Sequence, residues 1–222
     1  KAEVYNDYRR LLEEKKPLDA VIVATGDYWH VPLATAFIKA GKHVFCEKPL
    51  GHAIAEIREL RALARSAKVM TQMGAQGGST ETFRRSIEII QAGVLGQVRE
   101  VHGWDPRPCG PSSARPPENA SVPPGLNWDF WLGPKSLRPY HPTYHPGNWR
   151  AWLDFGNGDL GDIGPHSYNL PIRALNLDQP VRVDAISAEP VKESYPSQCK
   201  YRFDFAARGP LPPVTLWWYD GA

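Results

Sequence analysis

The sequence predicts an α/β protein in which a parallel sheet is followed by an α+β part that contains a second sheet. Up to Gly74, short apolar strand patterns alternate with amphipathic helix patterns, the order typical of a parallel sheet with right-handed crossover helices. After Gly74, one helix pattern leads into strand patterns that are no longer separated by regular helices. The 222 residues suffice for one large domain or two small ones.

The first half of the chain contains three predicted helices and three predicted strands. The run DAVIVA is β-branched throughout and is typical of a parallel strand covered on both faces. Pro32 is acceptable in the first turn of a helix, and Gly41 suits the end of that helix. The predicted order is helix 5–16, strand 19–24, helix 31–40, strand 43–46, helix 53–66 and strand 69–73.

The second half has a different pattern of elements. A helix closed by Gly93 is followed by an alternating strand, and a largely helical stretch then leads into three further strands. The predicted order is helix 80–92, strand 97–104, helical 160–175 and strands 181–188, 200–205 and 214–219.

A proline-dense insertion occupies residues 105–148. Eleven of the 22 prolines lie between Pro106 and Pro146, and the same stretch contains Trp128, Trp131 and Tyr144. A disordered linker is poor in aromatic residues. We therefore expect an ordered loop packed by its own rings, and long ordered loops are usually functional.

Composition excludes several classes of protein. The balance of 26 basic and 24 acidic residues gives no electrostatic case for nucleic acid or a membrane surface as a partner. The three cysteines are far apart and form no CxxC pair, which argues against a disulfide framework and a structural zinc site. No run of 18 apolar residues is present, and residues 1–5 do not resemble a signal peptide.

Lys48 is the first candidate for chemistry. It follows a predicted buried strand and precedes Pro49, which favours an extended conformation for Lys48. This places its ammonium group at the carboxyl edge of the parallel sheet, where open α/β folds bind ligands. The alternatives are that Lys48 points into water at a strand end and that Glu47 simply pairs with a neighbour.

Asp162 and His166 form the second candidate. Residues four apart on a helix lie on one face, and a carboxylate beside an imidazole orients it and raises its basicity, as a general base requires. The alternative is that Asp162 is only the N-cap, which Pro165 favours because proline is tolerated in a first helical turn. A helix that starts near Asp162 is compatible with both interpretations.

Other polar and aromatic residues favour structural interpretations. His141 and His145 are also four apart, but the prolines that follow them forbid a regular helix, so no metal site is expected. Trp217 and Trp218 are expected to pack in a sheet. Arg84 and Arg85 are expected to lie on a solvated helix face.

Motifs along most of the chain resemble the Gfo/Idh/MocA family of nicotinamide-dependent sugar and polyol oxidoreductases. The signatures are EKP at residues 47–49 and the Asp-x3-His pair at Asp162 and His166, within the segments DAVIVAT, GKHVFCEKPL and GDLGDIGPH. The central segments resemble a branch common in bacteria that degrade complex polysaccharides: TQMGAQGGS, IQAGVLGQVREVHGW, LNWDFWLGP and RPYHPTYHPGNWRAWLDFGNGDLGD.

The resemblance implies roles for individual residues. Lys48 would hydrogen-bond the reacting hydroxyl, His166 would take its proton, and Asp162 would orient His166. The cofactor would be NAD or NADP. Residues implied to lie beside it are Thr25, His30, Glu47 and Lys48, and the aromatic insertion would contribute Tyr144, Trp149 and Arg150 to a carbohydrate site.

The resemblance also implies a domain division. Residues 1–76 would be the C-terminal part of a Rossmann dinucleotide-binding domain without its first βαβ unit. Residues 77–222 would be a substrate and oligomerisation domain with a mainly antiparallel open sheet, incomplete at its C-terminus. No GxGxxG turn is present, so this piece by itself is expected to be inactive. Pro165 and Asn169 also depart from the family pattern.

The function expected from the resemblance is hydride transfer between a nicotinamide cofactor and a secondary hydroxyl of a sugar, glycoside or cyclitol. The alternatives are a glycoside-cleaving enzyme of the same fold that works through a transient keto intermediate, and a non-catalytic carbohydrate-binding protein. Expected partners are a small carbohydrate and a second copy bound through the sheet of the second domain. The compartment stays open between the cytoplasm and folded export behind a twin-arginine signal.

Overall fold

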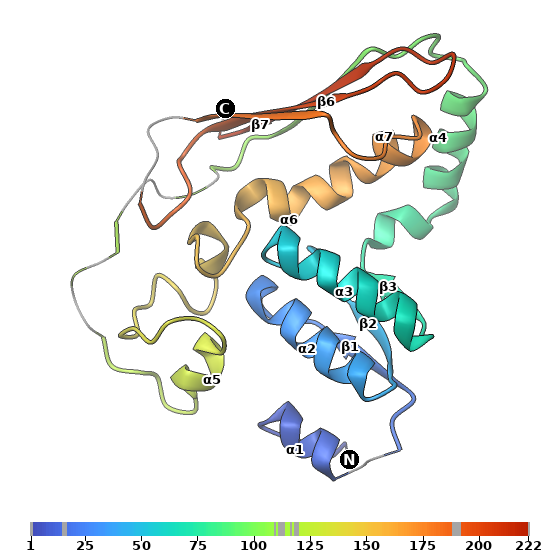
Figure 1. Cartoon of the computed structure of the whole chain (residues 1–222). Coiled ribbons are helices and arrows are strands. Elements are labelled where there is room, and N and C mark those ends of the chain that lie inside the picture. Colours follow the sequence, from blue (N-terminus) through green and yellow to red (C-terminus); the bar gives the residue numbers. More distant parts are fainter. Residues whose placement is uncertain are drawn as a thin grey trace. The chain divides into compact units, whose positions relative to one another are not determined.

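A computed structural model of the chain describes residues 2–14, 17–108, 110, 114–115, 117, 120–187 and 192–221. The chain forms two compact units, residues 1–74 and 75–222. The domain boundary expected from the sequence falls after residue 76, two residues later. Figure 1 shows the helices and strands of both units.

The first unit contains a three-stranded parallel sheet in the order β1-β2-β3. Its strands are joined by helices, as the alternating sequence pattern predicts. The elements are α1 (Tyr8–Glu13), β1 (Ala20–Val23), α2 (Asp27–Lys39), β2 (His43–Cys46), α3 (Ile54–Ala67) and β3 (Thr71–Met73).

Helices α2 and α3 cover one face of this sheet (Figure 1). Val23 and Cys46, which are partners in the parallel register, lie in the core beneath these helices. On the opposite face, their neighbours Ile22 and Phe45 are 74% and 36% exposed. The prediction that DAVIVA is covered on both faces is therefore wrong for this chain: successive residues alternate between a covered and an open face.

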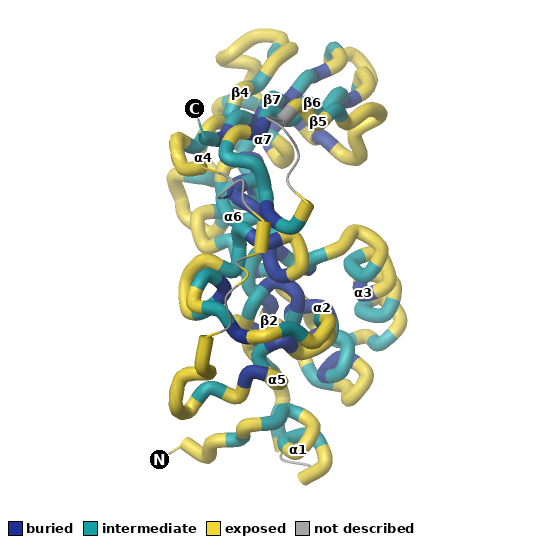
Figure 2. Tube along the Cα trace, turned by 90° about the vertical axis from the view of Figure 1, so that its left-hand side faces the viewer, coloured by how far each residue is buried: buried dark blue, intermediate teal, exposed yellow. Residues whose placement is uncertain are grey.

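Helix α2 begins earlier than the sequence suggested. Gly26 is its N-cap, and Asp27 stands in the first turn, where a carboxylate is favoured by the helix dipole. Pro32 consequently lies in the interior of the helix and not in its first turn. Figure 2 shows buried residues concentrated along α2, whereas Leu60 is the one residue of α3 that counts as buried.

The second unit is built on a four-stranded mixed sheet in the order β4-β7-β6-β5. Only β4 and β7 are parallel; the other two pairs are antiparallel, which confirms the mainly antiparallel second sheet. Its elements are η1 (Gln76–Ser79), α4 (Glu81–Gln91), β4 (Glu100–Asp105), α5 (Trp128–Leu132), η2 (Trp149–Ala151), α6 (Gly158–Ser167), α7 (Asn169–Ala174), β5 (Arg182–Ser187), β6 (Cys199–Phe205) and β7 (Val214–Asp220).

One face of the second sheet packs on side chains from helices α4 and α6, and α7 packs against these two helices. Strand β7 alternates strictly, with Leu216 and Trp218 fully buried and Trp217 half-buried on the other face. Tyr168 closes the core from the helix side, and its hydroxyl donates a hydrogen bond to the carbonyl of Trp217. The expected sheet packing of Trp217 and Trp218 is confirmed, and it fixes the end of α6 against β7.

The described part of the insertion is an ordered loop packed by aromatic rings, as predicted. Trp128 stacks on Trp131 with ring centroids 4.7 Å apart, and the indole of Trp128 donates to the carbonyl of Arg138 over 2.7 Å. Tyr144 is completely buried among these rings. We call these rings the aromatic cluster, which contains Trp128, Trp131, Tyr140, Tyr144, Trp152 and Phe155.

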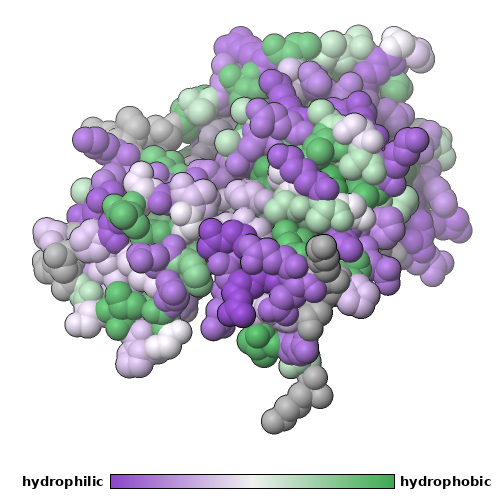
Figure 3. Space-filling model, turned by 60° about the horizontal axis from the view of Figure 1, so that its bottom comes forward, coloured by the Kyte–Doolittle hydropathy of each residue, from purple (hydrophilic) through white to green (hydrophobic). Residues whose placement is uncertain are grey.

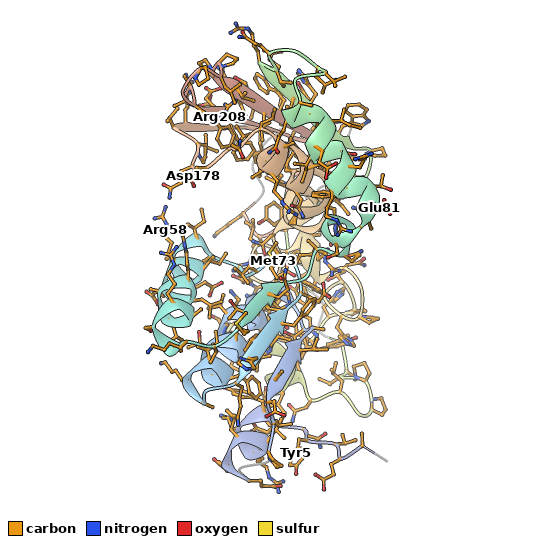
Figure 4. All side chains as sticks on the ribbon, turned by 90° about the vertical axis from the view of Figure 1, so that its right-hand side faces the viewer. Tyr5, Arg58, Met73, Glu81, Asp178 and Arg208 are labelled. Atoms are coloured by element: carbon orange, nitrogen blue, oxygen red, sulfur yellow. The ribbon has the colours of Figure 1, made fainter. Side chains whose placement is uncertain are left out.

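Within the described residues, no helix is long and apolar enough to cross a membrane. Figure 3 shows apolar and hydrophilic residues interspersed on the face that it presents. Arg84 and Arg85 lie exposed on α4, as expected. Glu81, in the first turn of the same helix, is also exposed (Figure 4).

Candidate active site

The carboxyl ends of the three parallel strands bring several predicted residues to one edge of the first sheet. Thr25 follows β1, and Glu47 and Lys48 follow β2 directly. The amide of Glu47 donates to the carbonyl of Val23 over 2.9 Å, and the amide of Gly74 donates to Cys46 over 2.7 Å. Lys48 therefore lies at the carboxyl edge of the sheet, where the sequence placed it.

Gly74 follows Met73, the last residue of β3 (Figure 4), and its missing side chain makes room for Glu47. A Cβ at Gly74 would lie 2.6 Å from the Oε2 atom of Glu47, closer than van der Waals contact permits. The Glu47 carboxylate is thus held against the end of the neighbouring strand. Thr25 is exposed, whereas Glu47 and Lys48 are half-buried, and the peptide bond between Lys48 and Pro49 is cis.

The buried ring of His30 connects the loop that follows β1 with the loop that follows β2. The ring is 1% exposed, with Nδ1 2.6 Å from the carbonyl oxygen of Pro49 and Nε2 3.1 Å from that of Thr25. A neutral imidazole donates one of these hydrogen bonds and a protonated ring donates both. His30 therefore ties the turn that carries Lys48 to the turn that carries Thr25, and its contact with a cofactor stays a prediction.

In the second unit, helix α6 carries both Asp162 and His166. The helix begins at Gly158 with Asn157 as its N-cap, so the interpretation of Asp162 as the N-cap is wrong. Pro165 is the eighth helical residue, and the expected confinement of proline to the first turn also fails here. Asp162 and His166 remain one turn apart on the helix.

Asp162 faces arginines in this structure. Its carboxylate oxygens lie 3.3 Å from Nε of Arg150 and 3.8 Å from Nη1 of Arg107. Among the residues that the structure describes, no hydrogen bond joins Asp162 to His166. The role of Asp162 in orienting His166 therefore stays a prediction. What the structure shows is the Asp162 carboxylate beside the guanidinium groups of Arg107 and Arg150.

Arg107 joins Asp162 to two further carboxylates. Its Nη2 lies 2.9 Å from Oδ1 of Asp159 and 3.1 Å from Oδ2 of Asp105, at the end of β4. We call Asp105, Arg107, Arg150, Asp159 and Asp162 the carboxylate–arginine cluster. Arg107, Arg150, Asp159 and Asp162 line a pocket of about 270 Å³ whose lining residues all belong to the second unit, and Asp105 holds Arg107 beside it.

Asp159 is the most buried member of this cluster, with 6% of its side chain exposed. Burial raises the pKa of the Asp159 carboxyl to about 6, although the Arg107 guanidinium acts in the opposite direction. Burial also acts to raise the pKa of Asp105, but the hydrogen bonds from Arg107 outweigh it and hold that pKa below its ordinary value. Two carboxylates that share one arginine therefore differ in proton affinity.

Sequence reasoning missed Asp159 and Arg107. Asp159 and Asp162 are three apart in GDLGD, a spacing that places both on one helix face and was available as a signal. Arg107 belongs to the proline-dense insertion, and its contacts with α6 depend on how that loop folds.

The predicted substrate residues differ in accessibility. Trp149 and Arg150 are half-buried, and the Arg150 guanidinium lies 4.3 Å from the centre of the Trp149 ring. Arg150 also lines the pocket beside Asp162. Tyr144 has no exposed surface because it packs inside the aromatic cluster, so the prediction that its ring contacts a substrate is not supported.

No group of three or more histidine, cysteine, aspartate or glutamate residues suited to hold a metal ion occurs in the described ranges. His141 and His145 instead take part in loop packing. Nδ1 of His141 lies 2.9 Å from the Thr143 hydroxyl, and the His145 ring contacts Trp131.

Comparison with known proteins assigns both units to one family. Residues 1–75 match the family model described as an oxidoreductase family with an NAD-binding Rossmann fold. Residues 89–204 match the model for the C-terminal alpha/beta domain of the same oxidoreductase family.

Individual relatives agree with this assignment. An inositol 2-dehydrogenase of Salmonella paratyphi B is 35% identical over 103 residues, which cover 46% of this chain and 30% of that protein. A 1,5-anhydro-D-fructose reductase of Ensifer adhaerens is 26% identical over 174 residues, which cover 77% of this chain and 41% of that protein.

A solved structure shares the fold. The crystal structure of an inositol dehydrogenase homolog from Azotobacter vinelandii, complexed with NAD+, superposes with a TM-score of 0.70 at 21% identity. The match covers 98% of this chain and 50% of that one, so the chain spans about half the length of this relative. The chain belongs to the Gfo/Idh/MocA oxidoreductase family, with an NAD-binding Rossmann-type first unit and the family's α/β domain as the second.

Proposed function

We propose that the protein oxidises a secondary hydroxyl of a sugar, glycoside or cyclitol with NAD or NADP. The observation that carries the proposal is the polar pocket beside Asp162 on α6, where carboxylates and guanidinium groups converge. Hydroxyl groups both donate and accept hydrogen bonds, so such a lining matches a polyhydroxylated molecule. The names of the inositol dehydrogenase and anhydrofructose reductase relatives point to the same class of substrate.

In this proposal, oxidation divides the two hydrogens of the alcohol between two acceptors. The bound nicotinamide supplies the chemistry of accepting the hydride from the carbon. His166 takes the proton from the hydroxyl oxygen, and the electron pair left on that oxygen forms the carbon–oxygen double bond as the hydride leaves the carbon. Lys48 donates a hydrogen bond to that oxygen and stabilises the negative charge that develops on it. Asp162 lies one helical turn before His166, on the same face, and orients its imidazole ring.

The residues present at the strand ends fit the nicotinamide side of a dinucleotide. The Thr25 hydroxyl is exposed, and Glu47 is seated against Gly74 at the next strand end. Gly26, the N-cap of α2, contributes no side chain at the start of that helix. Thr25, Glu47 and Lys48 would hold this part of the cofactor, with His30 fixing the loops beneath them.

The test uses the full-length protein with NAD+ and NADP+ separately and a panel of cyclitols, hexoses and glycosides. Formation of reduced nicotinamide with one polyol is the expected result. Lys48→Ala and His166→Ala are expected to lower kcat at least about 100-fold. The matched controls Lys39→Ala and His102→Ala, exposed residues outside the site, are expected to retain activity.

Other outcomes would refute the proposal. Cleavage of a glycoside without net reduced nicotinamide would support the glycoside-cleaving alternative. Binding of a carbohydrate without turnover by any pairing of cofactor and polyol would support a non-catalytic protein. Full activity of both Lys48→Ala and His166→Ala would exclude the mechanism.

A further inference from the structure

The pocket of the carboxylate–arginine cluster contains more recognition groups than proton transfer requires. Asp162 alone among its lining residues belongs to the Asp-x3-His pair. Asp159 and Arg107 also line the pocket, and nothing in the proposed proton transfer uses them.

Asp159 is the informative residue of this pocket. Its side chain is 94% buried, yet only Oδ1 is paired, with Nη2 of Arg107 at 2.9 Å. Oδ2 is buried and has no hydrogen-bond partner within the part of the chain that the structure describes. A buried acceptor left without a partner costs free energy, so such an atom in a polar pocket points to a ligand that donates to it.

Charge and size define the class of ligand. The positive charges of Arg107 and Arg150 balance the negative charges of Asp159 and Asp162. The lining therefore offers hydrogen-bond donors from the arginines and acceptors from the carboxylates. With two cationic and two anionic side chains, this lining carries no net charge and therefore favours neither an anion such as phosphate nor a cation such as an ammonium group over a neutral ligand. The volume of about 270 Å³ is at the small end of ligand sites, which are roughly 300–1,000 Å³. The fitting ligand is a neutral polyol with a single ring.

The pocket is also held in shape by its backbone. A Cβ at Gly156 would lie 2.3 Å from the Cα of Arg150, so the two chain segments touch at a position that only glycine permits. Arg107 is fixed from the other side, because its own amide donates to Oδ1 of Asp105 over 2.9 Å. The recognition groups are therefore placed before a ligand arrives, as specificity requires.

We propose that Asp159 and Arg107 form a specificity-determining subsite, in which Asp159 accepts a hydrogen bond from a hydroxyl of the polyol and Arg107 donates to a neighbouring hydroxyl. The proposal rests on the proposed function, because it places these hydroxyls beside the one that Asp162 and His166 act on. It assigns the choice among epimers to residues outside the Asp-x3-His pair.

The test is a comparison of binding, which needs no turnover. Isothermal titration calorimetry on the full-length protein measures Kd for myo-inositol, D-glucose and singly deoxygenated analogues of each. Wild type is expected to bind one analogue about tenfold more weakly than its parent, because a buried acceptor loses its donor. In Asp159→Ala, this difference is expected to shrink to about twofold or less. The control Asp184→Asn, in an Arg182–Asp184 pair on strand β5, should retain it.

Asp159→Asn and Arg107→Lys keep the test decisive if Asp159→Ala does not fold, because both retain a polar side chain of similar size. Each is expected to weaken discrimination between parent and analogue while thermal unfolding stays cooperative. The subsite is overturned if both variants discriminate as wild type does, if wild type binds no polyol of the panel, or if inorganic phosphate competes for the pocket. Failure of the proposed function is a separate outcome: polyol binding with Asp159-dependent discrimination, but no reduced nicotinamide.

Discussion

Replacing Asp159 with asparagine removes a buried carboxylate while retaining an oxygen that accepts from Arg107. The ordinary pKa of this carboxyl is 3.8, and burial raises it to about 6 in the folded chain. Between these values the folded state binds a proton that the unfolded state does not. The free energy of unfolding therefore falls as the pH rises from about 4 to about 6.

The size of this effect follows from the two pKa values. At 1.36 kcal/mol for each pH unit, the separation between 3.8 and about 6 corresponds to about 3 kcal/mol. Wild type is thus expected to lose up to about 3 kcal/mol of stability through this one group between acidic and neutral pH. Asp159→Asn has no such proton, so its stability relative to wild type is expected to rise by about that amount over the same window.

The assay is urea unfolding of both proteins at several pH values from about 4 to about 7.5, with ΔG extrapolated to water. Asp204→Asn supplies a control of opposite sign. Burial acts to raise the pKa of Asp204, but hydrogen bonds from Arg202 and Thr215 outweigh it and lower that pKa. Asp204→Asn is thus expected to be less stable than wild type at neutral pH, with the deficit shrinking in acid. A stability difference for Asp159→Asn that is independent of pH would refute the reasoning.

Three further changes have expected outcomes. Tyr144→Phe removes a buried hydroxyl that has no partner among the described residues, so thermal unfolding should show a gain of about 1 kcal/mol or no loss. Gly74→Ala displaces the Glu47 carboxylate by a side-chain rotation, so the KM for NAD+ should rise while Tm changes by only a few degrees. Trp104 is 71% exposed on the outer face of the second sheet; if copies pair through that face, Trp104→Asp should lower the mass measured by light scattering.

The sequence predicted strands better than helix boundaries. The strands at 20–23 and 43–46 could be predicted because both are short apolar runs rich in β-branched and aromatic residues, which favour strands. Proline misled the helix starts in two places. Pro32 and Pro165 both suggested a first turn, yet each lies inside a helix that begins earlier. Tertiary packing of the helices outweighs the lost backbone hydrogen bond at these residues.

Site residues could be predicted where local structure places them and could not where tertiary contacts do. Lys48 could be placed because a strand end fixes the residue that follows it, and the Asp162–His166 spacing is local to one helix. The contacts of Arg107 could not be foreseen, since this residue belongs to an irregular loop and reaches α6 through the fold. His30 was assigned to the cofactor for its position in the chain, and its burial between two carbonyls emerges only in three dimensions.

The buried acid at position 159 links stability to recognition. An uncharged side chain there would avoid the free-energy cost that the raised pKa of Asp159 indicates, and Arg107 would still be held by Asp105. Stability therefore gives no reason for a buried carboxylate at this position. Destabilising charges in a pocket are typical of sites where a ligand supplies the missing hydrogen bonds. A saturating polyol should offset part of this cost, so ligand-induced stabilisation should be larger for wild type than for Asp159→Asn at neutral pH.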